Sequence, residues 1–114
     1  MAYDEFLADR IKITLQEKRI PFIEKKMMGG LCFMVDGKMC VGVIKNDLMT
    51  RVHPDQYDRL LQKKGSKAMD FTSRIMKGFI MVEPAGVDMD EDLDEWIQHC
   101  LDFNPLAKSS KKKK

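Results

Sequence analysis

The dipeptide Asp36-Gly37 separates two short runs rich in apolar residues, Leu31 to Val35 and Lys38 to Ile44. A two-residue Asp-Gly link between such runs is the strongest short-range indication of a β-hairpin, because both residues tolerate the positive φ angles of a type I′ turn. The chain is therefore expected to build its fold on an antiparallel sheet. The expected register sets Val35 opposite Lys38, Met34 opposite Met39, Phe33 opposite Cys40, and Cys32 opposite Val41.

In this register, both faces of the hairpin are apolar. Phe33 and Cys40 share one face, and the other face carries Cys32, Met34, Met39 and Val41. A strand with one face in water alternates apolar and polar residues, so both faces need a cover. Helices account for one face. The other is covered either by a second copy of the chain, which predicts a homodimer, or by short flanking segments, and the sequence leaves both open.

Methionine is frequent throughout the strand-like segments. Its flexible, polarizable side chain suits adaptable binding surfaces, and it also fills cores. Neighbouring strand residues face opposite ways, so Met27 and Met28 cannot both point into one core. The candidate surface for a partner or for self-association consists of Met28, Cys32, Met34, Met39 and Val41.

The remaining periodicities predict three helices and four further extended segments. Three- and four-residue apolar spacing indicates helices over residues 3–18, from His53-Pro54 to Gly65, and over 91–103. Extended segments are expected at 22–27, 48–52, 68–71 and 76–83. The order is helix, three or four strands, helix, two strands, helix. Because the strands follow one another without crossover helices, we expect an α+β fold with a mainly antiparallel sheet and helices packed on it.

The charge of the chain is divided unevenly. Five of its 20 Lys and Arg residues are Lys108 and Lys111 to Lys114, a segment without acids. Residues 1–107 therefore hold 15 basic against 18 acidic groups, a net charge of −3. The body lacks the strongly basic footprint of a DNA-binding domain. We expect one domain over residues 1–105 and a disordered, Lys-rich tail over 106–114.

A smaller basic group surrounds the strand ends. Its members are Lys25, Lys26, Arg51, Arg74 and Lys77. They are interpreted either as a solvated rim or as an anion-binding patch, which with the tail would serve a nucleic-acid accessory protein.

The residue types that carry catalysis or bind metals are sparse. Cys32, Cys40, Cys100, His53 and His99 are the only soft ligands, and their spacing fits no zinc motif. No base is spaced to activate a cysteine nucleophile, so buried structural cysteines and no cofactor are expected. The acidic start is no signal peptide, and no apolar run is long enough for a membrane span. A cytoplasmic protein with reduced thiols, in no contact with a membrane, is expected.

Several segments together resemble the N-terminal domain family of the TfoX/Sxy competence regulators. The opening Met1 to Leu7 is similar to the family start, and stronger similarity lies in the segments Lys25 to Met34, Met39 to Val43, Asp47 to Val52, Met69 to Thr72 and Met76 to Phe79. The resemblance covers roughly residues 1–103. It implies a two-layer α-β(3)-α-β(2)-α fold like that of type III secretion chaperones.

The resemblance also implies a function. It indicates a link to transcriptional control of competence through contacts with a regulator of the cyclic-AMP receptor type, and it supplies no catalytic residues. The sequence thus predicts a non-enzymatic regulatory or adaptor protein that contacts a protein partner. The alternatives are the nucleic-acid accessory protein and a small-molecule sensor or minor enzyme with a pocket near Gly29-Gly30.

Overall fold

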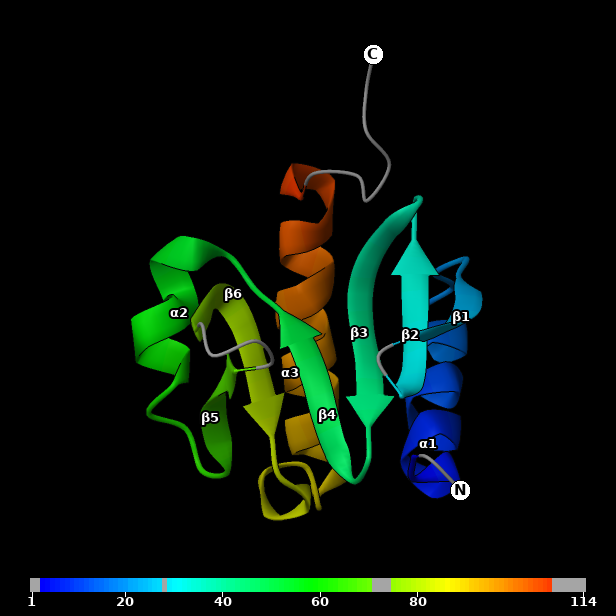
Figure 1. Cartoon of the computed structure of the whole chain (residues 1–114). Helices are drawn as coiled ribbons and strands as arrows, with labels where there is room; N and C mark the ends of the chain where they lie inside the picture. Colours follow the sequence, from blue (N-terminus) through cyan, green and yellow to red (C-terminus); the bar gives the residue numbers. More distant parts are fainter. Residues whose placement is uncertain (1–2, 28, 71–74, 108–114) are drawn as a thin grey trace.

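The described part of the chain folds into a six-stranded antiparallel sheet with three α-helices (Figure 1). The structure, a computed structural model, describes residues 3–27, 29–70 and 75–107. The elements in chain order are α1 (Glu5–Glu17), β1 (Ile23–Met27), β2 (Gly30–Val35), β3 (Lys38–Ile44), β4 (Asp47–Arg51), α2 (Pro54–Leu60), β5 (Ser66–Asp70), β6 (Ile75–Val82) and α3 (Asp90–Phe103). Two 3-10 turns, Pro84–Gly86 and Asn104–Leu106, flank α3. The α+β class and the antiparallel sheet predicted from the sequence are confirmed.

The strands lie in the order β1-β2-β3-β4-β6-β5. Four consecutive strands form a meander, and β6 then pairs with β4, which leaves β5 at the far edge. Four strands precede α2, because Ile23–Met27 pairs with β2 along its whole length. The periodicity allowed three or four strands here, and the family resemblance implied three.

Local sequence accounts for the element ends. Asp4 caps α1, since its Oδ1 accepts hydrogen bonds from the backbone N–H groups of Phe6 at 2.9 Å and Leu7 at 3.2 Å. Asp36 and Gly37 adopt φ angles of 59° and 76°, as a type I′ hairpin turn requires. Pro54 opens α2 at a position where its missing N–H costs nothing.

One side of the sheet packs against the helices and forms the main core. Figure 1 shows α3 running behind the middle strands. All three helices contribute fully or nearly fully buried side chains, including Ile11 and Leu15 from α1, Leu60 from α2, and Trp96 and Ile97 from α3. We call this set the helix-side core.

The β2–β3 register differs from the expected one at a bulge. Val35 pairs with Lys38 and Met34 with Met39 as expected, but Phe33 pairs with Val41 because Cys40 is an extra residue in β3. The assignment of Val41 to the opposite face is therefore wrong: it lies with Phe33 in the helix-side core. Cys40 also lies in that core and Cys32 does not, as predicted.

The described fold extends slightly past the expected domain boundary at residue 105. Leu106 closes the last 3-10 turn, and Ala107 is buried. Asn104 secures this end, because its side-chain nitrogen donates to the carbonyl oxygen of Val35 at 3.1 Å. Of the tail expected over residues 106–114, residues 108–114 lie outside the described residues.

Candidate functional site

The sheet face opposite the helices carries a second apolar cluster. We call it the second-face cluster; it comprises Cys32, Met34, Ile44, Met49 and Met81, with Met39 and Phe79 packed against it. Its predicted members Cys32, Met34 and Met39 are thus brought together, whereas Val41 belongs to the other face and Met28 lies outside the described residues. The cluster is apolar, as the sequence predicts.

The five core members of this cluster are nevertheless 8% exposed or less within the single chain. Gly30, beside Ile44, and Gly42, beside Met49, allow close packing here. A Cβ atom added at Gly42 would lie 2.6 Å from the carbonyl oxygen of Leu31 and 3.2 Å from Cε of Met49. Because most of its side chains are shielded, this cluster offers a partner little more than the half-buried Met39 and Phe79.

The predicted basic rim does not converge among its described members. Lys25 pairs with Cys32 and Lys26 with Leu31, so the two lysines project toward opposite faces of the sheet. Arg51 lies three strands away, about 14 Å at the usual strand spacing. Arg74 lies outside the described residues, and only the backbone of Lys77, within β6, is described.

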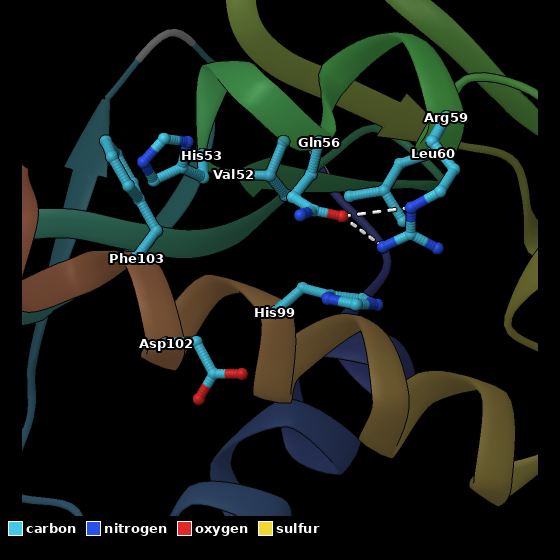
Figure 2. A pocket seen from close by; sticks show the side chains of 8 residues that line it. All are labelled: Val52, His53, Gln56, Arg59, Leu60, His99, Asp102 and Phe103. Carbon is cyan, nitrogen blue, oxygen red and sulfur yellow. Dashed lines mark hydrogen bonds between the residues drawn. The ribbon is translucent and has the colours of Figure 1, made fainter.

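A groove lies between α2 and α3 (Figure 2). Its volume is about 330 Å³, and its lining consists of Val52, His53, Gln56, Arg59, Leu60, His99, Asp102 and Phe103. We call it the α2–α3 groove. Figure 2 shows Arg59 held against Gln56, which accepts hydrogen bonds from the guanidinium group, one of them at 3.0 Å from Nε.

The two histidines of this groove have defined roles. Nδ1 of His53 accepts a hydrogen bond from the backbone N–H of Asp55 at 3.0 Å and thereby caps α2. His99 stacks edge-on against Trp96, and burial lowers its pKa below the ordinary value. His99 is therefore neutral near pH 7. Nδ1 of His53 is occupied by the hydrogen bond that caps α2.

An adjoining hollow of about 480 Å³ opens around Arg51. It shares Val52, His53 and Phe103 with the α2–α3 groove and adds Arg51, Pro54, Gly78, Phe79 and Leu106. We call it the Arg51 hollow. Its lining is apolar apart from Arg51 and His53, and Leu106 at its rim is 64% exposed.

Two aromatic rings hold the Arg51 guanidinium group. Its carbon lies 5.5 Å from the ring centre of Phe79 and 5.9 Å from that of Phe103, within the range of cation–π contacts. Phe79 is the direct cross-strand partner of Arg51, and Phe103 is the last residue of α3. His53 meets the Phe103 ring edge-on at 5.5 Å between ring centres. The residue that caps α2 therefore contacts one of the two rings that hold Arg51.

The three cysteines are shielded from solvent. All three are free thiols and buried, and burial raises the pKa of Cys32 to about 11 and that of Cys40 to about 12. Burial also raises the pKa of Cys100 well above its ordinary value. These thiols stay protonated near neutral pH and are poor nucleophiles there.

Of the residues that gather at the Arg51 hollow, only Arg51 was predicted from the sequence to have a surface role. Phe79, Phe103 and Leu106 were not predicted. A signal existed for Phe103, which follows Cys100 by three residues and Trp96 by seven and so shares the apolar stripe of α3. No local signal links Arg51 to Phe103, because the contact joins residues 52 positions apart.

No helix in the described part of the chain is long and apolar enough to cross a membrane. Within the same residues, no group of three or more His, Cys, Asp or Glu side chains is placed to hold a metal ion.

Comparison with known proteins gives one family. The model of the TfoX N-terminal domain matches residues 15–104. No curated protein and no solved structure matches the chain. Since the family match spans the whole sheet, α2 and all of α3, this chain belongs to the TfoX N-terminal domain family.

Proposed function

We propose that the chain is a non-enzymatic adaptor in transcriptional regulation, and that it binds a protein partner at the Arg51 hollow and the adjoining α2–α3 groove. The observation that carries the proposal is the apolar rim of the hollow, where the exposed Leu106 stands beside the half-buried Phe79 and Phe103. Aromatic and apolar side chains gathered at a concave surface, with an arginine among them, are typical of protein-binding sites.

The chemistry of the hollow and groove favours binding over catalysis. None of the described residues that line them is a serine, threonine or cysteine. The cysteines elsewhere are buried and protonated, and Nδ1 of His53 is engaged in capping α2. Membership of the TfoX N-terminal domain family supports the link to competence-type regulation.

The nucleic-acid alternative has less support. Lys25 and Lys26 project toward opposite faces, so they do not form one phosphate-binding surface with Arg51. The net charge of residues 1–107 is −3, which repels a polyanion, so the alternative depends on the tail lysines Lys108 and Lys111 to Lys114.

The adaptor function is tested by capture followed by reconstitution. Tagged native protein, Leu106→Lys and Ile23→Lys are expressed in the cells of origin, and each captured protein is then purified and titrated calorimetrically against all three. Ile23 is the matched control, because it is 71% exposed and lies on the edge strand β1, three strands away from Arg51 on β4.

We expect a transcription regulator or one of its accessory proteins to bind native protein and Ile23→Lys equally, and Leu106→Lys at least about tenfold more weakly. The proposal fails if no captured protein reconstitutes, or if every one that does binds Leu106→Lys as tightly as native protein.

A further inference from the structure

Arg51 combines partial burial with the lack of an acidic neighbour among the described residues. No described carboxylate lies within 4.0 Å of its guanidinium group, whereas Arg10, Lys12, Lys18, Lys63 and Lys67 all have such a partner. Among the described residues, its side chain makes one hydrogen bond, which goes from Nη1 to the carbonyl oxygen of Met39 at 3.4 Å. Most of its five N–H donors thus have no partner in the part of the chain that the structure describes.

The surroundings of Arg51 fix the position of this cation. Phe79 and Phe103 both contact the guanidinium group, and β4 anchors its backbone between β3 and β6. Aromatic contact holds the planar group without consuming its donors. A guanidinium group so restrained loses little conformational freedom when it binds a planar anion through two parallel hydrogen bonds.

The size and polarity of the hollow limit the anion. Apolar residues Val52, Pro54, Phe79, Phe103 and Leu106 form most of a lining that encloses about 480 Å³. A space of this size holds a few side chains. A ligand that fits this lining therefore presents one carboxylate with large apolar groups beside it. A polyphosphate, which is charged along its whole length, does not fit a lining that is mostly apolar.

The neighbouring α2–α3 groove extends the same surface. It continues from the hollow through Val52, His53 and Phe103, and it adds the cation Arg59 against the single carboxylate of Asp102. The site is thus locally basic on a body whose net charge is −3. Such a local contrast favours a short acidic segment over an extended polyanion.

We infer that the Arg51 hollow binds a peptide segment of the partner in which an Asp or Glu carboxylate stands next to large apolar side chains, with the carboxylate on Arg51 and the apolar groups against Phe79, Phe103 and Leu106. The inference rests on the proposed adaptor function and names the chemistry that the partner presents. Charge complementarity at Arg51 is what selects the occupant.

A displayed library of random ten-residue peptides, selected on the full chain, tests the inference. We expect the enriched peptides to carry Asp or Glu beside Leu, Ile, Phe or Trp. Synthetic versions should bind Arg51→Met on the order of tenfold more weakly than native protein, because a charged hydrogen-bond pair is lost. Arg51→Lys should retain part of the affinity, since it keeps the charge and loses the two-pronged geometry.

The matched change in the peptide, from Glu to Gln or Asp to Asn, should weaken binding to native protein and have little further effect on Arg51→Met. Circular dichroism of each variant verifies the fold, and Ile23→Lys serves as the surface control. The inference is overturned if selection enriches no peptide, if the enriched peptides lack acids, if Arg51→Met binds them as native protein does, or if a single-stranded DNA oligonucleotide displaces them.

The two proposals fail separately. A reconstituted partner that binds Arg51→Met as tightly as native protein, but loses affinity for Leu106→Lys, overturns the carboxylate inference and leaves the adaptor function standing. A reconstituted partner that binds Leu106→Lys as tightly as native protein overturns the adaptor function at this site.

Discussion

The guanidinium carbon of Arg51 lies 5.9 Å from the ring centre of Phe103, so the end of β4 and the end of α3 meet around one cation. The same ring also meets His53 edge-on. Phe103 therefore links the sheet, α2 and α3 at the mouth of the Arg51 hollow, and it shapes the proposed binding site as well as supporting the fold.

Replacing Phe103 by alanine should lower the free energy of unfolding by about 1–3 kcal/mol, because a half-buried ring loses its contacts with Arg51 and His53. Urea denaturation measures the change. Phe6→Ala is the control, since Phe6 is 72% exposed on α1 and should alter stability by no more than about 0.5 kcal/mol. Equal effects of the two substitutions would show that Phe103 does not organise this end of the molecule.

The buried thiols predict a loss of stability in alkali. Burial raises the pKa of Cys32 from 9.0 to about 11 and that of Cys40 to about 12. In the unfolded chain these thiols ionise above pH 9, whereas in the folded chain they stay protonated. Below pH 9 the difference vanishes; above it the folded state binds more protons, so the free energy of unfolding falls as pH rises.

Urea denaturation at pH 8 and pH 10 measures this fall, and Cys32→Ala should reduce it. Alkylation by iodoacetamide at pH 8 should also be slow in native protein and fast in urea, because the reactive thiolate is scarce in the folded state. Fast alkylation of native protein at pH 8 would contradict the burial of these thiols.

The sequence predicted most of the fold, because periodicity and turn chemistry act locally. The Asp36-Gly37 turn located its hairpin, and the apolar stripe of α3 was identified almost to its ends. The β3 bulge left no such signal, since Cys40 fits an unbroken strand equally well. The sequence therefore predicted the wrong face of the sheet for Val41. The Arg51 hollow was missed because it arises only when Phe79 and Phe103 converge on Arg51 in the folded chain.

The second face provides a matched pair of residues. Ile23 and Met34 are direct cross-strand partners on that face, yet Ile23 is 71% exposed and Met34 only 8%. Met34→Asp should lower the free energy of unfolding by about 2–4 kcal/mol, because it buries a charge without a partner. Ile23→Asp should change it by no more than about 0.5 kcal/mol. Urea denaturation of both variants is the measurement, and similar effects would contradict the difference in burial.

The homodimer remains a prediction, and Ile23 tests it. A second copy docked on the second face would cover this exposed side chain. If the predicted homodimer uses that face, light scattering should give twice the chain mass for native protein and a single chain mass for Ile23→Asp. A native protein of single-chain mass would contradict the homodimer and would agree with the shielding of the second-face cluster within the single chain.

The nucleic-acid alternative predicts a steep dependence of DNA affinity on salt and a joint loss on replacing Lys25 and Lys26. Because these lysines project toward opposite faces of the sheet, we expect no joint loss of affinity when both are replaced. Fluorescence anisotropy with a short labelled duplex should show that Lys25→Ala/Lys26→Ala binds as weakly as native protein does. A cooperative loss of tight native binding would favour the alternative.

Site-specific photo-crosslinking in the cells of origin tests the central claim most directly. A benzoyl-phenylalanine placed at residue 106 lies at the rim of the Arg51 hollow, and one placed at residue 23 lies exposed on the edge strand β1, three strands away from Arg51. We predict a discrete crosslinked protein from residue 106 that is absent from residue 23 and disappears when Arg51→Met is introduced. The same products from both positions, or none from residue 106, would contradict a partner-binding site at this hollow.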